Sequence, residues 1–521
     1  MISAVISRSA RRTAEIRPRR RRGWAALLSV FAVLVLTVAL GTPAGAEQQR
    51  VVRISADPFT STTSPAAQHS TEVEPDTFSF GDTVVSAFQV GRVPNGGASD
   101  IGWAVTRDGG HSWHHGFLPA ATTAANPPGP YVAASDASVA FDFRHHTWLI
   151  SWLGLTQFGG NVVDVLVSRS TDDGRTWSGP VVVAATGVFY DKNWSACDNT
   201  PKSPFFGHCY TEFDNASMRD LELMSTSTDG GRTWGAAMAT ADAVHGLGGQ
   251  PVIQPSGRVV VPFRGVTSPS GIRSFSSDNG GKSWNASVLV SAISRHVVAG
   301  DIRTSPLPTA EVSGDGTVYV AWQDNRFETG GTANDIVLSS SHDGTTWSAV
   351  GRIPLDAVGS NVDHFIPGLA VDRFSAGSRT RLALTYYFYP AANCTAATCQ
   401  LQVGFTSSRD GGQHWASPDT LAGPMMLSQL ANTTQGVMVG DYISTSFVSE
   451  SEPFLFGQAR AVPVFAVGRT PTAGSAFNEP MVSTVETVRG GQIPMGNDPV
   501  VFTGGGSTGG DDSGTTPPTA F

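Results

Sequence analysis

Ser170-Thr-Asp172-Asp-Gly174-Arg-Thr176-Trp177 is one copy of a short pattern, Ser/Thr-x-Asp-x-Gly-x-Ser/Thr-Trp, that recurs six times along the chain. An Asp in such a turn accepts hydrogen bonds from backbone groups that follow it, and Gly supplies the positive φ that a tight turn needs. Apolar stretches lead into and out of this copy, at Val162–Ser170 and Gly179–Ala184. The pattern therefore predicts a β-hairpin at each copy, with the Trp packed onto a neighbouring sheet.

The other copies keep this frame with small departures. Asn279 takes the place of the acid in the fourth copy, and His342 takes it in the fifth, with Asp343 beside it. His414 replaces the hydroxyl residue of the sixth copy. We assign a structural role to the acids, or the Asn, and the tryptophans of the six turns, which are Asp108, Trp113, Asp172, Trp177, Asp229, Trp234, Asn279, Trp284, Trp347, Asp410 and Trp415.

The spacing of the copies predicts the fold class. Consecutive repeat tryptophans lie between 50 and 68 residues apart, which fits one four-stranded sheet per repeat. Radial repetition of such sheets gives an all-β propeller, whereas the rival β-solenoid has much shorter repeats. A seventh unit without the pattern follows at Gly440–Ser444 and Ala461–Val467, so seven blades are favoured over six. Arg50–Ser55, or the strand near Met481–Val488, is expected to complete the last sheet.

Composition agrees with this reading and excludes other classes. Only 15% of the 521 residues are charged, against about 25% in average globular proteins. The 58 Gly and 32 Pro indicate frequent turns, and the aromatic content excludes a disordered chain. The formal net charge of −9 argues against nucleic acid as a partner, because phosphate binding needs a basic face.

Residues 1–46 have the pattern of a secretory signal peptide. Eight Arg precede an apolar run at Trp24–Leu40, and Gly41–Ala46 ends in a small-x-small cleavage pattern. A retained signal anchor is the alternative, and Sec and Tat export both stay open. We expect a secreted, extracellular protein with an N-terminal segment at 47–70, the propeller at 71–490, and a flexible Gly/Ser/Thr/Pro-rich tail at 491–521. No other run is long enough to span a membrane.

The four cysteines form two local pairs. Cys197 and Cys209 are 12 residues apart, and Cys394 and Cys399 are 5 apart. Two disulfides in an oxidising compartment are favoured. Zinc is the alternative, but neither pair has the Cys-x-x-Cys spacing.

The six copies resemble the Asp-box (BNR) repeat of the sialidase superfamily. The resemblance spans roughly residues 70–490 and implies a β-propeller in which the boxes are structural hairpins away from the active site. For a sialidase it further implies three arginines that bind the substrate carboxylate, a Tyr nucleophile with its Glu, and an Asp acid/base. The Phe/Tyr-Arg-Ile-Pro motif of the first arginine is absent. The nearest matches are Val52-Arg53-Ile54-Ser55 and Pro262-Phe263-Arg264-Gly265.

Candidate functional residues follow from the expected starts of the inner strands, because loops that enter these strands converge at the mouth of a propeller's channel. The catalytic candidates are Asp191, Asp441, Tyr442 and Glu74. The substrate-binding candidates are Arg303, Arg264, Arg326, Lys192 and His364. The alternative is that these residues cap the inner strands and bond to one another.

Two functions stay open at this point. The first is a glycoside hydrolase, sialidase-like in architecture, that acts on extracellular glycans or glycoproteins at the channel mouth. The second is a non-catalytic propeller that binds glycan or protein. We expect a monomer, and we predict no cofactor. Acidic turns leave calcium open, although the sequence has no twelve-residue calcium loop.

Overall fold

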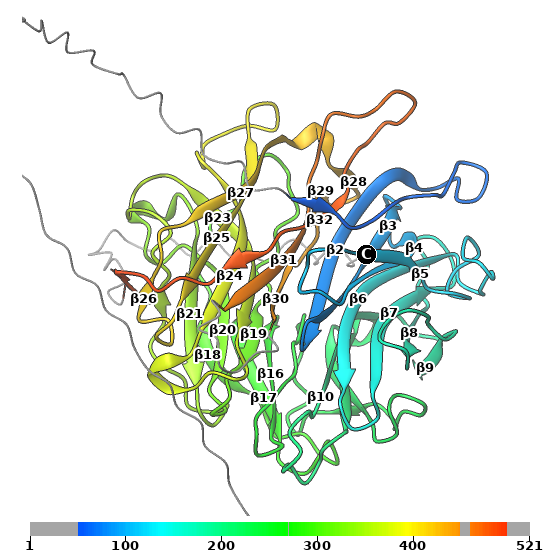
Figure 1. Ribbon diagram of the computed structural model, residues 1–521, viewed down its shortest axis with the longest axis horizontal. Helices are drawn as coiled ribbons and strands as arrows, with labels where there is room; N and C mark the ends of the chain where they lie inside the picture. The colour runs from blue at the N-terminus through cyan, green and yellow to red at the C-terminus, as the bar shows by residue number, and fades with distance from the viewer. Residues whose placement is uncertain (1–50, 269, 449–458, 497–521) are drawn as a thin grey trace, which may run out of the picture. The chain divides into compact units, whose positions relative to one another are not determined.

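Antiparallel strands form nearly all of the regular structure in the computed structural model, which describes residues 51–268, 270–448 and 459–496 (Figure 1). The expectation of an all-β protein is confirmed. The predicted signal peptide lies outside the described residues. Within them, no helix is long and apolar enough to cross a membrane. The helical elements of the described part are four single 3-10 turns, η1 (Ala216–Met218), η2 (Thr329–Gly331), η3 (Gly377–Arg379) and η4 (Leu427–Gln429).

The first sheet has eight strands and combines two hairpin-rich halves. The order is β2-β3-β4-β6-β7-β8-β9, with β5 added on β4. A single residue pair, Ala98 with Ala134, joins the two halves. The strands are β2 (Gln68–Phe80), β3 (Thr83–Arg92), β4 (Ala98–Thr106), β5 (His114–Phe117), β6 (Ala133–Asp142), β7 (Thr147–Leu155), β8 (Val163–Ser170) and β9 (Val181–Ala184).

Two further sheets follow along the chain. One has the order β10-β11-β12-β13, and the next has the order β14-β16-β17-β18 with β15 also paired to β16. Their strands are β10 (Tyr190–Cys197), β11 (Cys209–Asn215), β12 (Leu221–Ser227), β13 (Met238–Ala239), β14 (Gly246–Leu247), β15 (Val252–Ile253), β16 (Val259–Gly265), β17 (Gly271–Ser277) and β18 (Val288–Ala292).

The next two sheets have the orders β19-β20-β21-β22 and β23-β24-β25-β27. Their strands are β19 (Thr309–Val312), β20 (Val318–Asp324), β21 (Asp335–Ser341), β22 (Gly351–Arg352), β23 (Asp363–Val371), β24 (Leu382–Tyr389), β25 (Gln400–Ser408) and β27 (Asp419–Met426).

The last large sheet joins the two ends of the described chain. Its order is β1-β32-β31-β30, with β33 also on β31. Both segments that the sequence offered for completing this sheet are therefore part of it. The strands are β1 (Val52–Arg53), β30 (Ser444–Val448), β31 (Arg460–Ala466), β32 (Met481–Ser483) and β33 (Glu486–Thr487).

Two strand pairs stand outside the large sheets. β26 (His414–Trp415) pairs with β34 (Ile493–Pro494), and β28 (Ala431–Thr433) pairs with β29 (Gly436–Met438). Gly496 also pairs with Arg352. Residues 493–496, at the start of the predicted tail, are thus bonded to the sheets. The rest of that tail, 497–521, lies outside the described residues.

The innermost strands touch one another in sequence. β2 contacts β6, β6 contacts β10, β10 contacts β15, β15 contacts β19, β19 contacts β23, β23 contacts β30, and β30 contacts β2. This arrangement brings residues that are far apart in sequence to one central place. That place holds the candidate site.

Each repeat turn leads out of the third strand of its unit. In the first, Oδ1 of Asp108 accepts hydrogen bonds from the amides of His111 (3.0 Å) and Ser112 (2.9 Å), and the Thr106 hydroxyl donates to it at 2.7 Å. Side-chain and backbone donors together hold the pKa of this carboxyl at about 2, against the opposing effect of burial. The acid is therefore a structural element of the turn.

The fifth turn corrects the sequence alignment. Asp343 accepts from the amides of Thr345 (2.8 Å) and Thr346 (2.6 Å), while the ring of His342 lies 3.0 Å from the Thr317 hydroxyl. This turn is one residue shorter than the others, so Asp343 rather than His342 takes the acid position. In the sixth turn the ring of His414 replaces the missing hydroxyl, with Nδ1 at 2.7 Å from Asp410.

The repeat tryptophans pack onto the preceding unit. Much of the hydrophobic core therefore lies between neighbouring units. Trp177 contacts Trp103 of β4, with ring centroids 6.4 Å apart. The indole nitrogen of Trp347 donates to Ser274 of β17 at 3.2 Å. Trp113 of the first turn packs with Val448 and Val462 of the last sheet. Burial of these large rings ties each unit to the one before it.

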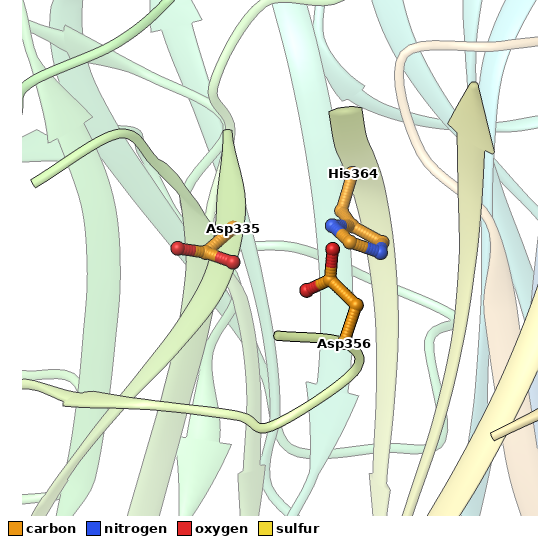
Figure 2. A group of neighbouring side chains, drawn as sticks. All are labelled: Asp335, Asp356 and His364. Atoms are coloured by element: carbon orange, nitrogen blue, oxygen red, sulfur yellow. The ribbon is translucent and has the colours of Figure 1, made fainter. Parts of the chain in front are cut away.

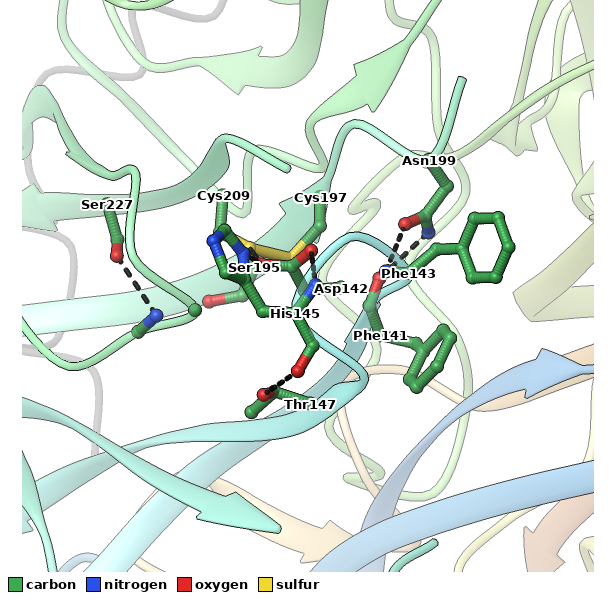
Figure 3. Close-up of a disulfide and its surroundings, with 12 residues drawn as sticks. Phe141, Asp142, Phe143, His145, Thr147, Ser195, Cys197, Asn199, Cys209 and Ser227 are labelled. Carbon is green, nitrogen blue, oxygen red and sulfur yellow. Dashed lines mark hydrogen bonds and ion pairs between the residues drawn. A yellow bond between two sulfur atoms is a disulfide. The ribbon is translucent and has the colours of Figure 1, made fainter. Parts of the chain in front are cut away.

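Both expected disulfides are present, and one of them holds a loop against a neighbouring hairpin. Cys197–Cys209 links the ends of β10 and β11 across residues 198–208 (Figure 3), and Cys394–Cys399 closes a short loop before β25. Asn199 of the first loop accepts from the amide of Phe143 at 2.8 Å and donates to the Phe141 carbonyl at 2.8 Å. These bonds fix the loop against the β6–β7 hairpin.

Candidate functional site

Bulges at matching positions of the innermost strands create the site. The register shifts in β2 between Val73 and Asp76, in β6 between Ser135 and Ser138, and in β10 between Asp191 and Trp194. A bulge re-aims the side chains around it and is common beside functional sites. One residue in each of these bulges has a left-handed φ, namely Glu74 (56°), Asp136 (46°) and Lys192 (43°).

This backbone conformation is costly for residues other than Gly, on the order of 1–3 kcal/mol each. Ile366 of β23 has it too, at 50°, in a bulge between Phe365 and Gly368. In the first three strands the strained residue is charged, and the three charged side chains meet. Retention of charged residues at positions that favour Gly marks this place as a functional candidate.

Lys192 lies at the centre of the cluster. Its Nζ is 2.6 Å from Asp441 Oδ2, 2.9 Å from Asp136 Oδ1 and 3.7 Å from Glu74 Oε1. All four side chains are buried. Burial acts to lower the pKa of the ammonium, but the three surrounding carboxyl groups raise it well above its usual value. Lys192 therefore stays charged and holds the carboxyl groups together.

Arg303 completes the cluster from the other side of Asp441. Its Nε donates to Asp441 Oδ1 at 2.8 Å, and its Nη2 donates to Oδ2. Burial alone raises the pKa of Asp441, but Arg303 and Lys192 outweigh that effect and hold the pKa well below its usual range. Asp441 is thus ionised at any physiological pH.

Glu74 and Asp191 have the opposite tendency. Burial raises the pKa of Glu74, although Lys192 partly offsets this, and burial together with the charge of Asp136 raises the pKa of Asp191 to about 8. Glu74 accepts from the Gln89 amide and from the Asp441 backbone N–H. Oδ2 of Asp191 has no hydrogen-bond partner. The site therefore combines an ionised carboxylate with carboxyl groups that favour the protonated form.

Tyr442 does not have the surroundings of a nucleophile. Its hydroxyl donates to the Ala137 carbonyl at 3.2 Å. Burial and the nearby carboxyl groups raise its pKa well above 10, so the phenolate is strongly disfavoured. Its ring stands edge-on to Trp194 at 5.1 Å. The ring forms an aromatic wall, which corrects the nucleophile role that the sequence suggested.

Several of these side chains border a small cavity of about 20 Å³, which we call the narrow cavity. Asp136, Lys192 and Asp441 supply its charged lining, and Trp194 and Tyr442 supply its aromatic lining. A concave site with aromatic walls and a few convergent polar groups is the usual form of a ligand site.

Three of the predicted substrate-binding residues have partners elsewhere. Arg264 donates to Ser305 at 2.6 Å, and Arg326 is bound to Asp324, with its Nε 2.9 Å from Oδ1. His364 is buried against Asn334 and the rings of Tyr386 and Phe388. The structure brings together Glu74, Asp191, Lys192, Arg303, Asp441 and Tyr442 of the predicted residues, and three converging arginines are not found among them.

Asp136 and Trp194 were among the residues at the expected strand starts but were given no catalytic or binding role, whereas Gln89 and Arg92 were missed. Asp136 stands in an expected strand start, so its charge in an apolar strand was a usable signal. Arg92 donates to Gln89 at 3.0 Å and to the Gly97 carbonyl at 2.7 Å, on β3, the second strand of its unit. Because Gln89 and Arg92 both lie on β3, a rule based on the first strand of each unit could not have found them.

A possible metal group lies apart from the narrow cavity. Asp335, Asp356 and His364 point toward one another (Figure 2), and in the described residues they alone of the His, Cys, Asp and Glu side chains form a trio with ligand atoms all within 4.8 Å. The guanidinium of Arg352 is 2.8 Å from Asp335 and also contacts Asp356. The Arg352 guanidinium is therefore already paired with both carboxylates. Burial lowers the pKa of His364 to about 4.

A row of buried acids lies in the same sheet as Lys192. Asp191 is paired in register with Asp214, and Asp214 with Glu222, while Glu212 lies two residues before Asp214 on β11. The carboxyl groups of Glu212 and Glu222 interact with each other, and neither oxygen of Asp214 has a hydrogen-bond partner. Burial raises the pKa of all three, that of Glu222 to about 7. We call Glu212, Asp214 and Glu222 the buried acid row.

Comparison with known families identifies the repeat. Residues 146–368 match the family model described as the BNR repeat-like domain. The repeats are of the BNR type. This match covers fewer than half of the residues and confirms the resemblance to BNR (Asp-box) repeat domains. No curated protein matches the chain.

Solved structures with similar folds have low identity. A Hadza microbial sialidase is 12% identical, with a TM-score of 0.43, over 79% of this chain and 74% of that chain. A polysaccharide lyase described as an ulvan lyase is 12% identical with a TM-score of 0.48, over 86% and 97%. An intramolecular trans-sialidase from Ruminococcus gnavus is 13% identical with a TM-score of 0.38, over 85% and 99%. These values say nothing about the reaction of this chain.

Proposed function

We propose that the protein is a retaining glycoside hydrolase that acts on glycans outside the cell. The observation that carries this proposal is that Asp136 and Asp441 share one ammonium at the wall of the narrow cavity. Because Lys192 Nζ lies 2.9 Å and 2.6 Å from these two carboxyl groups, the two oxygens are less than about 6 Å apart. Retaining glycosidases place their two carboxyl groups about 5–5.5 Å apart.

We assign the two carboxyl groups two different roles. Asp441, kept ionised by Arg303 and Lys192, attacks the anomeric carbon, while Asp136 gives a proton to the leaving oxygen as the glycosidic bond breaks. Water then cleaves the glycosyl–Asp441 ester, and Asp136 takes up the proton of that water. Trp194 and Tyr442 offer aromatic faces to the sugar ring. The absence of three converging arginines among the predicted residues favours substrates other than sialosides.

A panel of fluorogenic glycosides and natural glycans, sialosides included, tests the proposal. We expect release from at least one neutral or uronic glycan by the wild type. Asp441→Asn and Asp136→Asn should each lower kcat by about 10³-fold or more, measured at a temperature where circular dichroism shows that the variants are folded. Asp172→Ala, in a repeat turn, serves as the matched control and should keep the wild-type rate. Release at the wild-type rate by both site variants would reject the proposal.

A second function is favoured by one observation. Lys192 and Arg303 already neutralise Asp136 and Asp441, so the cluster is satisfied without any reaction. A glycan-binding protein without catalysis would have such a site. Binding to immobilised glycans that is lost in Asp441→Asn, together with no release from any glycan in the panel, would establish this alternative.

Two finer features belong to the same proposal. The sheets are read as seven blades of one propeller, which is supported by the circle of contacts from β2 through β30 and back to β2. Export is supported by the two disulfides, which form in oxidising compartments. N-terminal sequencing of the protein from culture medium should give a chain that begins at Glu47, and a chain that keeps residues 1–46 would reject cleavage there.

A further inference from the structure

A second and larger cavity lies further along the same innermost strands. It has a volume of about 350 Å³ and is lined by residues that follow the bulges, such as Asp76 and Phe78 in β2 and Ser195 in β10. We call it the wide cavity. Trp194, Gln250 and Thr309 line both cavities, which therefore adjoin, whereas the side chains of the Lys192 cluster line only the narrow cavity. The wide cavity is therefore a different place from the candidate catalytic cluster.

An exposed aromatic side chain stands at the wide cavity. Phe374 is 73% exposed, the highest value for an aromatic side chain among the described residues. Its turn is held in place in part by Asp372, whose Oδ1 accepts a hydrogen bond from the Phe374 amide at 3.0 Å. The Ser375 hydroxyl donates to the Asp372 carbonyl at 2.7 Å, and the Gly314 amide donates to the Ser375 carbonyl at 2.9 Å. A large apolar ring is thus kept in water on a fixed turn.

The charged lining of the wide cavity consists of Asp76, Glu311 and Arg373. Arg373 is already engaged: its Nη2 donates to the Ser79 carbonyl at 2.9 Å, and its Cζ lies 4.4 Å over the ring of Phe78. Burial raises the pKa of Glu311 to about 8, even though Arg373 partly offsets this. Burial also raises the pKa of Asp76 to about 7. The wall therefore has little free charge near neutral pH.

These features select one kind of ligand. The Arg373 guanidinium is already occupied by the Ser79 carbonyl and the Phe78 ring, so it offers little to an anion. Burial favours the protonated forms of Asp76 and Glu311, so they offer little to a cation. A protonated Glu311 both donates and accepts hydrogen bonds, as the hydroxyl groups of a sugar require. A pyranose ring also has an apolar C–H face, which an exposed aromatic ring such as Phe374 can cover.

We propose that the wide cavity is a second binding site, which takes a neutral oligosaccharide with Phe374 against one sugar ring and Glu311 bonded to its hydroxyl groups. This site goes beyond the proposed hydrolase site. It would hold a glycan chain on the protein whether or not the narrow cavity cleaves it.

Calorimetric titration of the full secreted chain tests the proposal. The probes are cellohexaose, xylohexaose, maltohexaose, mannohexaose and chitohexaose, with sialyllactose as the anionic comparison. We expect at least one neutral hexasaccharide to bind, and Phe374→Ala to weaken it by about tenfold or more. Phe158→Ala, which removes another exposed aromatic ring that is not part of the cavity lining, is the matched control and should bind as the wild type does.

Two more measurements separate this site from the catalytic proposal. Glu311→Gln should keep binding at pH 7 and also at pH 9.5, where the wild type weakens because Glu311 ionises. Asp441→Asn should keep binding although any hydrolysis is lost. The proposal is overturned if no neutral hexasaccharide binds, if Phe374→Ala binds like the wild type, if sialyllactose binds as tightly, or if Asp441→Asn alone abolishes binding.

Discussion

Aspartates serve two opposite purposes in this molecule. In the repeat turns they are near the surface, bonded to several donors, and have lowered pKa values, as Asp108 and Asp172 do at about 2. Around Lys192 and in the buried acid row they lie inside the protein, where burial raises the pKa values of Asp191 and Asp214. An aspartate of a repeat turn therefore stabilises the turn, whereas a buried aspartate of the Lys192 cluster or the acid row is a candidate for chemistry.

The difference follows from what surrounds each carboxyl group. A turn supplies backbone N–H groups and hydroxyls within a few residues, so a carboxylate there is satisfied by local sequence alone. A carboxyl group on an innermost strand depends on charges from other sheets, such as Lys192 for Asp136 and Arg303 for Asp441. Removing one partner should therefore cost far more in the cluster than in a turn.

The largest effect is expected for Lys192→Met. This change leaves the buried carboxyl of Asp136 without its cation, and breaking a buried pair typically costs about 3–5 kcal/mol. The free energy of unfolding, from chemical denaturation, should fall by that amount. Lys282→Met, at an exposed position of the fourth turn, is the matched control and should change it by less than about 0.5 kcal/mol.

A double variant makes this test specific. Lys192→Met combined with Asp136→Asn should recover part of the lost stability, because no uncompensated charge remains at that position. Equal losses in the single and double variants would mean that Lys192 acts through packing alone.

The second effect is a pH dependence that comes from the buried acid row. Glu222 has a pKa of about 7 in the folded protein, above its value of about 4.3 in an unfolded chain. The folded state keeps a proton that the unfolded chain has already lost, so stability is highest below pH 4 for this group and falls as pH rises to about 7. The melting temperature should therefore be lower at pH 8 than at pH 5.

Glu222→Gln removes this contribution. Between pH 5 and 8, the free energy of unfolding of the variant should change by about 2 kcal/mol less than that of the wild type. Asp172→Asn is the control, because its pKa of about 2 places its titration below this range. An unchanged slope in Glu222→Gln would show that Glu222 ionises normally in the folded protein.

The comparison also explains how far the sequence could lead. The turns were predictable because each is complete within eight residues, and spacing then gave the fold class. The positions of Asp191, Lys192 and Asp441 were found as charges in apolar strand starts. Their roles were not, because a pKa depends on neighbours from other sheets, and no spacing showed that Arg303 and Lys192 would both reach Asp441.

Two predicted roles are disfavoured for the same reason. Tyr442 matched the residue type of a nucleophile, but its hydroxyl is bonded to the Ala137 carbonyl, which only the fold brings near. Arg264 and Arg326 had suitable charge, but Ser305 and Asp324 hold them elsewhere. Residue type was thus a poor guide to the hydrogen-bond and ion-pair partners of these side chains.

A smaller effect is expected for Asp172→Ala in the second turn. The change removes an acceptor of the Arg175 and Thr176 amides, which lie 3.1 Å and 2.9 Å from Oδ1. Water replaces the carboxylate at this exposed turn, so the loss should be about 1–2 kcal/mol. Denaturation curves measure it, and a loss as large as that of Lys192→Met would erase the contrast between turn and cluster.

The smallest effect separates two neighbours in the fifth turn. His342→Ala should change the free energy of unfolding by less than about 0.5 kcal/mol, because its ring makes one bond, to the Thr317 hydroxyl, near the surface. Asp343→Ala should cost about 1–2 kcal/mol, as expected for an acid that accepts from the amides of Thr345 and Thr346. A larger loss for His342→Ala than for Asp343→Ala would place His342 in the acid position of the turn. It would also contradict the assignment of the fifth turn as one residue shorter than the others. The expected order would show that a repeat turn tolerates the loss of one residue as long as a carboxylate still faces its backbone amides.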